Sequence, residues 1–464
     1  MSILNEYIID YDLVLNFDIK DLLNLKILPL KKFDFYTLFA ISDECNLSYL
    51  NENYDLPIKI ITVNQNDILF ILKEFESRFE IYNLVKYSIL NSTNQRYINV
   101  FFTSLLDFAI TKCSSDIHFE CLDDALIIKF RIDGILLQFF KFDLNLYPIV
   151  SSVIKLYSQL DITQRRIPMN GRFSQEINCH KYDFRVSIMP TVCGESIVIR
   201  ILNKNNVEKS LDELGLDGIT VKTIKEKISR SQGMILVTGP TGSGKTTTLY
   251  SVLKLLSTQS KKIITIEDPV EYKLPNIQQI AINNEIGLTF SEVLKNVLRQ
   301  DPDVLMIGEI RDKESLDIAI QASLTGHLVL ATLHTNDSIS TINRLLDLNA
   351  EPFLVASTLK TIISQRLVLK LCEFCKIKVS EDDNVFENYG CDKCNLTGYK
   401  NREIVSELFV SDEKVASMIC KQTNINEIMK YCKTKGFKTL LENGMLKVKE
   451  GVIDKKEVYK VTSY

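Results

Sequence analysis

The sequence predicts an α/β fold in which a parallel β-sheet is covered by helices on both faces. Two observations in the middle of the chain support this prediction. Short runs that are apolar without alternation recur between helical segments, at residues 234–238, 263–266, 304–307 and 328–332. Such runs are typical of parallel strands buried on both faces. A glycine-rich turn also follows the first run directly and precedes a helical pattern, as expected where a strand leads into its crossover helix. At 464 residues the chain is too long for one core, so we expect several domains.

The first part of the chain carries no motif for chemistry. Residues 1–90 alternate short apolar runs with Asn, Asp and Lys, and we interpret them as a small α or α/β module. The polar stretch 91–96 follows an apolar helical pattern and is interpreted as a linker.

A second domain is predicted over residues 98–202. An amphipathic stretch at 100–110 precedes strand-like segments, which lie at 125–130, 135–140, 183–189 and 196–202. Asp133-Gly134 between two apolar runs is a strong hairpin signal. Polar residues then predict a second linker at 203–210.

The parallel-sheet domain is predicted over residues 211–371. Thr289 and Glu292 form a capping-box pattern before an apolar helical stretch, and Gly326 marks the expected end of a later helix. A cysteine cluster follows at 372–410, and residues 411–464 read as a helical region; overall we expect mostly helix after the cysteines.

Residues 239–246 satisfy the phosphate-binding P-loop pattern completely, and they lie between a strand and a helix as this motif requires. Backbone N–H groups of the turn would face a triphosphate, Lys245 would reach the outer phosphates, and the Thr246 hydroxyl would bind Mg²⁺. The alternative, a glycine-rich turn without a ligand, is weak beside the complete pattern. The predicted nucleotide-binding residues are Gly239, Pro240, Thr241, Gly242, Ser243, Gly244, Lys245, Thr246 and Thr247.

Two strand ends offer carboxylates for hydrolysis. Acidic residues lie in 267–271 and 308–312, each segment directly after an apolar run. The carboxyl ends of parallel strands face the ligand crevice, and hydrolysis needs a carboxylate that orients or activates water. Taken singly, such acids are as often helix caps or solvated loop residues.

Four of the eleven cysteines predict a metal site. Cys372, Cys375, Cys391 and Cys394 form two C-x₂-C pairs separated by fifteen residues, a spacing that suits a structural zinc site with four thiolate ligands and no open position. Free core thiols or an iron–sulfur cluster remain as alternatives.

Composition restricts the class of protein. The formal charge of −4 does not supply the basic field that non-specific nucleic-acid binding requires. No apolar run reaches the roughly 18 residues that span a bilayer. The acidic start, with Glu6, Asp10 and Asp12, differs from the basic start of a signal peptide. We therefore expect a cytoplasmic protein.

Taken together, the motifs resemble those of the secretion ATPases that include general secretion pathway protein E and the type IV pilus assembly ATPase. The matching segments are 239–247 (Walker A), 267–272 (Asp box), 298–312 (Walker B), 325–336 (His box), and further upstream 115–118, 131–134, 183–187 and 194–196. The resemblance covers roughly residues 98–464. It implies a RecA-like ATPase domain, a preceding PAS-like α+β domain, a small N-terminal docking module and a tetracysteine zinc insertion.

The resemblance also implies roles for single residues. Glu271 would act on the attacking water, and Glu309 would hold Mg²⁺ or polarise that water. His327 and His334 would sense the γ-phosphate or couple it to domain motion, although a lone histidine is more often a satisfied core residue.

Three arginines of the second domain resemble residues that the family brings to the phosphates from outside the ATPase domain. They are Arg131, Arg185 and Arg200. The alternative is that each pairs with a carboxylate across neighbouring strands.

The implied function is that of a hexameric ATPase that powers pilin or pseudopilin fibre assembly, with ATP, Mg²⁺ and Zn²⁺ as cofactors. Assembly-type members of the family carry the tetracysteine module. The implied partners are an inner-membrane platform protein and the cytoplasmic domain of a membrane docking protein, with peripheral association at the inner membrane and no direct contact with nucleic acid. Two other functions compete, a RecA-like nucleic-acid translocase and a nucleotide-gated ring adaptor without fast turnover.

Overall fold

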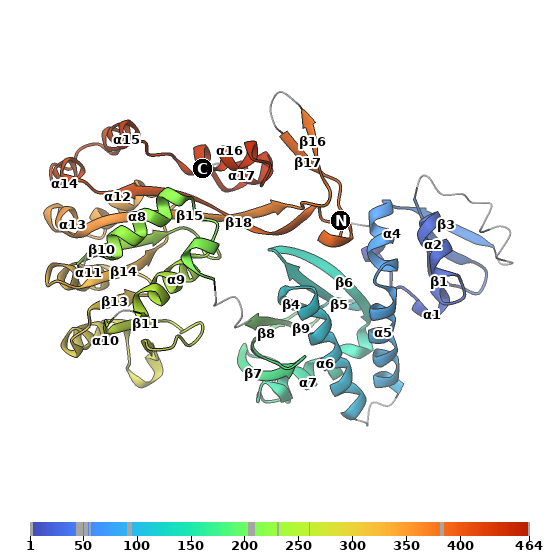
Figure 1. Cartoon of the computed structure of the whole chain (residues 1–464). Helices are drawn as coiled ribbons and strands as arrows, with labels where there is room; N and C mark the ends of the chain where they lie inside the picture. Colours follow the sequence, from blue (N-terminus) through green and yellow to red (C-terminus); the bar gives the residue numbers. More distant parts are fainter. Residues whose placement is uncertain are drawn as a thin grey trace. The chain divides into compact units, whose positions relative to one another are not determined.

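The chain divides into two compact units. The computed structural model describes residues 3–42, 50, 54, 57–90, 95–202, 209–229, 232–258, 260–380 and 385–462. The first unit comprises Met1–Asn203 with Gly390–Thr397, and the second comprises Lys204–Tyr389 with Gly398–Tyr464. Figure 1 shows the elements of each unit. Residues 91–94 and 203–208, which belong to the two predicted linkers, lie outside the described residues.

The N-terminal part of the first unit is a small α/β module. Its sheet has the order β1-β2-β3, with β1 antiparallel and β3 parallel to the central strand. The strands are β1 (Ile27–Lys32), β2 (Thr37–Ile41) and β3 (Ile58–Thr62). The helices are η1 (Ile3–Glu6), α1 (Tyr11–Val14), α2 (Ile19–Leu25), α4 (Gln65–Leu72) and α5 (Phe75–Leu90).

The rest of the first unit is built on an antiparallel sheet of six strands in the order β6-β5-β4-β9-β8-β7. The strands are β4 (Ser114–Cys121), β5 (Ala125–Ile132), β6 (Ile135–Asp143), β7 (Met169–Ile177), β8 (His180–Thr191) and β9 (Gly194–Leu202). The β5–β6 hairpin turns at Asp133 and Gly134, both at positive φ, which confirms the predicted Asp-Gly turn.

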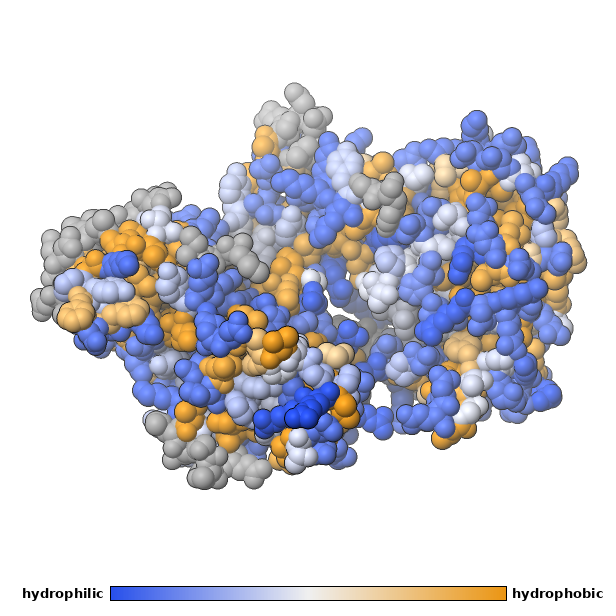
Figure 2. Space-filling view, turned by 180° about the vertical axis from the view of Figure 1, so that it is seen from behind, coloured by the Kyte–Doolittle hydropathy of each residue, from blue (hydrophilic) through white to orange (hydrophobic). Residues whose placement is uncertain are grey.

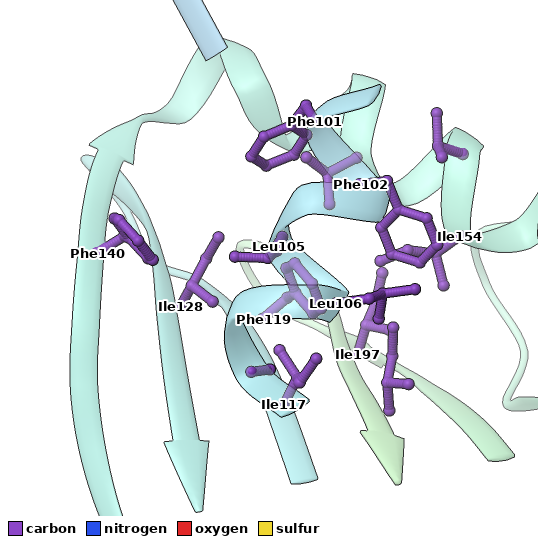
Figure 3. Close-up of a cluster of buried hydrophobic side chains, with 14 of the residues drawn as sticks. Phe101, Phe102, Leu105, Leu106, Ile117, Phe119, Ile128, Phe140, Ile154 and Ile197 are labelled. Carbon is purple, nitrogen blue, oxygen red and sulfur yellow. The ribbon is translucent and has the colours of Figure 1, made fainter. Parts of the chain in front are cut away.

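Helices α6 (Gln95–Thr111) and α7 (Tyr147–Tyr157) pack on this sheet. Figure 3 shows Phe101, Phe102, Leu105 and Leu106 of α6 lying over side chains of the strands. Because α6 begins at Gln95, the prediction of a linker over 91–96 is wrong for its last two residues; the apolar face of the helix extends one turn further upstream than its amphipathic pattern indicated.

The second unit contains a sheet of seven strands in the order β12-β11-β13-β14-β10-β15-β18. Every pair is parallel except β15 with β18. The strands are β10 (Gly233–Thr238), β11 (Ile263–Glu267), β12 (Gln278–Ala281), β13 (Val304–Ile307), β14 (Leu328–Leu333), β15 (Leu359–Leu371) and β18 (Tyr399–Val410). The four predicted apolar runs are therefore parallel strands, as expected.

Alternate residues of these strands face two different cores. Ile235 and Val237 of β10 pack with α8 (Gly218–Ile228) and α9 (Lys245–Ser257). Met234 and Leu236 pack with the helices of the opposite face, among them α10 (Phe290–Val297), α11 (Lys313–Leu324) and α13 (Pro352–Thr358). Burial on both faces explains why the strands read as continuous apolar runs.

Two predicted helix boundaries are present. Thr289 caps α10 by accepting a hydrogen bond from the Glu292 N–H at 3.3 Å. Gly326 follows the end of α11 with φ of 103°, a conformation that favours glycine.

The predicted helical region at 411–464 contains four helices in its described part, and the strands of this part of the chain lie before it, in the cysteine segment 372–410. Strands β16 (Lys376–Ser380) and β17 (Val385–Asn388) form a hairpin, and β18 returns to the main sheet. Strand β18 buries Val405 and Phe409 against the sheet and its helices, and this packing outweighs local propensity. The remaining helices are α12 (Ser340–Asp347), α14 (Glu413–Cys420), α15 (Ile425–Thr434), α16 (Leu440–Lys449) and α17 (Lys455–Thr462).

The surface is largely hydrophilic. Figure 2 shows hydrophilic residues over most of the visible face, with apolar residues scattered among them. Within the described ranges, no helix combines the length and the apolar character needed to cross a membrane.

Candidate active site

The predicted phosphate loop connects β10 to α9. Gly239, Gly242 and Gly244 adopt φ of 142°, 79° and 87°, which a residue with a Cβ adopts only under strain. At Gly239 a Cβ would also lie 2.4 Å from the Gln365 carbonyl oxygen, whereas at Gly242 it would meet nothing within 4 Å. The loop therefore needs glycine for backbone conformation at all three positions and for close packing at the first.

Lys245 opens helix α9 and lies over this loop. Its Nζ donates hydrogen bonds to the carbonyl oxygens of Gly239 at 2.8 Å and Pro240 at 3.0 Å. Burial lowers the pKa of Lys245, the Glu309 carboxylate raises it, and the Arg366 guanidinium lowers it further. A partly desolvated ammonium group gains from a nearby phosphate anion, so its environment suits triphosphate binding.

The Ser243 hydroxyl provides a second sign that the loop fits a nucleotide. Ser243 is buried, and its Oγ has no hydrogen-bond partner within the described part of the chain. A buried hydroxyl without a partner costs about 1–3 kcal/mol. A phosphate oxygen in the loop would supply the missing acceptor.

Two buried residues of β15, Gln365 and Arg366, lie beside the loop, and no sequence motif marks them. Gln365 donates from Nε2 to the Ser243 carbonyl oxygen at 2.9 Å and accepts from Thr248 Oγ1 at 3.0 Å. Arg366 donates to the Asn336 carbonyl oxygen at 2.7 Å. Gln365 thus ties the loop to the strand beside β10, and Arg366 ties that strand to the segment that follows β14.

Glu309 lies directly after β13, at the same edge of the sheet as the phosphate loop. Its Oε2 accepts a hydrogen bond from Arg311 Nε at 2.8 Å, and its Oε1 lies 3.2 Å from Nε2 of His334, which follows β14. The hydrogen bond and charge of Glu309 raise the pKa of Arg311. The backbone at Gly308, between β13 and Glu309, is fixed because Thr332 Oγ1 donates a hydrogen bond to the Gly308 carbonyl oxygen at 2.5 Å.

Glu271 lies on the neighbouring loop, which follows β11. Strands β11 and β13 are paired in parallel, so the loops that carry Glu271 and Glu309 leave the sheet side by side. Asp268 of the first loop lies 3.7 Å from Arg311 of the second. The Glu271 side chain is exposed, and Tyr272, the residue after it, packs edge-on against the ring of Tyr250.

The structure separates the two histidines. His334 follows the carboxyl end of β14, whereas His327 precedes its amino end, where the ring Nδ1 lies 2.9 Å from the Ala322 carbonyl oxygen. The strand between them spans roughly 16 Å at the usual rise of a parallel strand. His327 therefore lies away from the phosphate loop of its own chain, and its role in sensing the γ-phosphate or coupling it to domain motion stays a prediction.

The three predicted arginines lie in the first unit, on neighbouring strands. Asp116 pairs in register with Arg131 and with Arg200, and Arg200 pairs with Arg185. Asp116 lies 3.8 Å from Arg131 and accepts a hydrogen bond from Arg200 at 3.1 Å. The cross-strand pairing that the sequence left as an alternative is present for these two. A role at the phosphates stays a prediction for all three.

The four predicted cysteines come together. Their Sγ atoms all lie within 4.8 Å of one another, and the Sγ atoms of Cys391 and Cys394 are 3.7 Å apart. Tetrahedral zinc with Zn–S bonds of about 2.3 Å places its sulfur ligands about 3.8 Å apart. The cluster therefore fits a structural zinc ion held by Cys372, Cys375, Cys391 and Cys394.

Comparison with known proteins agrees with this site. Residues 91–460 match the family described as "Type II/IV secretion system protein". Type II secretion system protein HxcR of Pseudomonas aeruginosa is 41% identical over 359 residues, which are 77% of this chain and 76% of the relative. Type IV pilus assembly ATPase PilB of Thermus thermophilus is 40% identical over 366 residues, 75% of this chain and 41% of the longer relative.

A solved structure supports the fold. The pilus retraction motor PilT with bound ADP aligns with a TM-score of 0.54 at 25% identity, over 77% of this chain and 96% of that one. The similarity supports a RecA-like ATPase fold for the unit that contains the phosphate loop.

Proposed function

The chain belongs to the Type II/IV secretion system protein family and is an ATP-hydrolysing P-loop enzyme, and from this premise we propose that it is a cytoplasmic motor for fibre assembly. Its relatives include a type II secretion protein and a type IV pilus assembly ATPase. The observation that carries the proposal is the convergence of Lys245, Glu309 and His334 at one edge of the parallel sheet.

The loop residues would hold the nucleotide. Backbone N–H groups of residues 239–247 and the Lys245 ammonium would bind the phosphates, and the Thr246 hydroxyl would ligate Mg²⁺, which neutralises phosphate charge when bound. The hydroxyl of Ser243, a buried residue of this loop, would donate to a phosphate oxygen. The Gln365 bonds to the loop keep its N–H groups oriented before the substrate arrives.

The two acids would divide the work of hydrolysis. Glu309 would orient Mg²⁺ or polarise the attacking water, held in place by Arg311 and His334. Glu271 would take the proton of that water, for which its exposed position on the adjacent loop is suitable. His334 would report the state of the γ-phosphate to the segment after β14, whose Asn336 is bonded to Arg366.

The mechanical step would be a movement of one unit against the other. Arg131, Arg185 and Arg200 of the first unit would approach the phosphates when the units close, so that turnover depends on closure. In related chemistry an arginine that stabilises the transferred phosphate accelerates the reaction about 10³- to 10⁵-fold. Residues 203–210 would act as the hinge, and six chains would form the working ring.

The direction of the work is proposed from the cysteine cluster. Because Cys372, Cys375, Cys391 and Cys394 fit a structural zinc ion, the chain resembles the assembly-type members of the family. It would add pilin or pseudopilin subunits through an inner-membrane platform protein. Residues 1–90 would dock to a membrane partner, which would hold the motor at the inner membrane. Among the described residues of the site, no contact favours the two competing functions, a nucleic-acid translocase and a ring adaptor without turnover.

The experiment that tests the roles of the two acids is ATP turnover of the full chain with Mg²⁺. Glu271→Gln and Glu309→Gln should each slow phosphate release by about 100-fold or more while leaving nucleotide binding intact. Glu427→Gln, the same chemical change at an exposed position of α15, should leave it unchanged. Normal turnover in both acid variants would remove Glu271 and Glu309 from the chemistry.

A further inference from the structure

The loop that carries Glu271 is held by hydrogen bonds rather than by secondary structure. It runs from Asp268 to Ile277, between parallel strands β11 and β12, and contains neither helix nor strand. In a loop of this kind the position of the Glu271 carboxylate would vary unless other groups fixed the loop backbone. Three side chains next to the loop do so.

Gln279, on β12, closes the loop on itself. Its Oε1 accepts a hydrogen bond from the Leu274 N–H at 2.7 Å, and its Nε2 donates to the Tyr272 carbonyl oxygen at 3.1 Å. The same Nε2 lies 3.1 Å from Oε1 of Glu267, the last residue of β11. The Gln279 amide group thus links β12 to the end of β11 and to Tyr272 and Leu274 within the loop. Tyr272 is the residue that directly follows Glu271.

Glu267 is a buried acid that the proposed chemistry does not use. It is 3% exposed, and its carboxylate accepts hydrogen bonds from Gln279, from Thr265 Oγ1 at 2.6 Å and from the Tyr250 hydroxyl. Because these three neutral groups donate hydrogen bonds to it, the Glu267 carboxylate is not placed to act on the attacking water. It is an anchor to which the loop and a helix are both attached.

Tyr250 connects the anchor to the phosphate loop. It is 1% exposed and lies on α9, the helix that begins with Lys245. Its hydroxyl donates to Glu267. Its ring packs edge-on against Tyr272, with centroids 4.5 Å apart at 82°. The residue that directly follows Glu271 is therefore packed against the helix that carries Lys245.

We propose that Tyr250, Glu267 and Gln279 form a positioning cluster that sets the Glu271 carboxylate at its working distance from the phosphates held by Lys245. This inference rests on the proposed role of Glu271. The three residues would not touch substrate. They would act through the residues that follow Glu271, since the Tyr250 ring packs against Tyr272 and Gln279 holds residues 272 and 274.

The expected effect follows from the geometry of water attack. A displacement of about 1 Å of a positioned catalytic group costs up to about 100-fold in rate, whereas substrate affinity depends on the phosphate loop, which the cluster does not contact. Loss of a cluster residue should therefore lower kcat and leave the Kd for Mg²⁺·ATP unchanged.

The test compares Tyr250→Phe and Gln279→Leu with wild type in the full chain. Each variant should lower kcat by about 10- to 100-fold with a Kd for a fluorescent ATP analogue within twofold of wild type. Tyr431→Phe is the matched control, because it also removes a tyrosine hydroxyl bonded to a carboxylate, that of Asp412, on the surface of the same unit; it should leave kcat unchanged.

A second comparison separates positioning from general damage. In a Glu271→Gln background, Tyr250→Phe should cause no further loss of single-turnover rate, because the group it positions is already gone. Amide hydrogen exchange of residues 268–277 should be faster in Tyr250→Phe and in Gln279→Leu than in wild type, and unchanged in Tyr431→Phe.

The outcomes distinguish the two proposals. Normal kcat and unchanged exchange in both cluster variants would overturn the positioning cluster while leaving the role of Glu271 intact. An equal loss of rate on adding Tyr250→Phe to Glu271→Gln would overturn it as well. Normal turnover in Glu271→Gln alone would overturn the role of Glu271 itself.

Discussion

Glu309 and His334 meet at the carboxyl edge of the parallel sheet, where Oε1 of the glutamate lies 3.2 Å from Nε2 of the histidine. The contact exists because β13 and β14 are adjacent parallel strands, so the residues that follow them leave the sheet together. The histidine side chain is exposed and contacts the acid without being enclosed. It is therefore able to respond to a change in charge beside Glu309.

Loss of this contact should slow hydrolysis. His334→Gln keeps a polar side chain but removes the ring nitrogen that faces Glu309, and we expect turnover to fall about tenfold, because a hydrogen bond to a charged group contributes about 1.5 kcal/mol at the lower end. The measurement is phosphate release by the full chain at saturating Mg²⁺·ATP.

The other histidine of the motif provides the matched control. His327→Gln makes the same change at the opposite edge of the sheet, where the ring contacts the last turn of α11. We expect turnover within twofold of wild type. Equal losses in the two variants would contradict the distinction between the histidines.

The brace from β15 should govern nucleotide affinity. Gln365→Leu removes the hydrogen bonds to the Ser243 carbonyl and from Thr248. Because a buried hydrogen bond contributes about 1 kcal/mol net, we expect the Kd for Mg²⁺·ATP to rise about tenfold, as measured by titration with a fluorescent analogue. Gln321→Leu, at an exposed position of α11, should bind as wild type does, and equal affinity of the two variants would show that the brace is not needed.

The site could be predicted from the sequence wherever its signals are local. The phosphate loop is a contiguous motif, and Glu309 follows an apolar strand whose burial on both faces leaves a continuous run. The position of His327 is also local information, since a residue that precedes a parallel strand lies at the amino end of that strand. No sequence motif marks Gln365 or the positioning cluster. Their contacts join residues that are distant in the sequence, and the local sequence around each residue predicts only a strand or a helix. The same is true of β18, which reaches the sheet only after the cysteine hairpin.

The cysteine cluster should bind about one zinc ion per chain, since its four sulfurs have the spacing of a closed tetrahedral site. Cys394→Ser should lower the zinc content below half and reduce the melting temperature by several degrees. Cys432→Ser is the control, because Cys432 is buried in the core of the second unit and is not one of the four clustered cysteines. Metal analysis of the purified proteins checks both, and a wild-type chain without zinc would refute the prediction.

A buried ion pair in the first unit should control its stability towards acid. Burial alone would raise the pKa of Glu195, but hydrogen bonds from Lys155, Ser151 and Tyr147 outweigh it and hold the pKa below its usual 4.5. A carboxyl whose pKa is lowered by folding adds stability above its unfolded pKa and loses it as the pH falls through the folded value. The melting temperature of the wild type should therefore fall more steeply below pH 4.5 than that of Glu195→Gln, and parallel curves would contradict this assignment.

Removing the cation of that pair tests the same contact at neutral pH. Lys155 is 1% exposed and its Nζ lies 2.7 Å from Glu195, so Lys155→Met leaves a buried carboxylate without its cation, which costs about 3–5 kcal/mol. Lys129→Met breaks the partly exposed pair with Glu120 on the same sheet and should cost less than about 1 kcal/mol. Denaturant unfolding at pH 7 compares the two variants. Similar losses of unfolding free energy in Lys155→Met and Lys129→Met would contradict this prediction. They would mean that water solvates Glu195 in Lys155→Met and that the buried pair contributes no more than a surface pair.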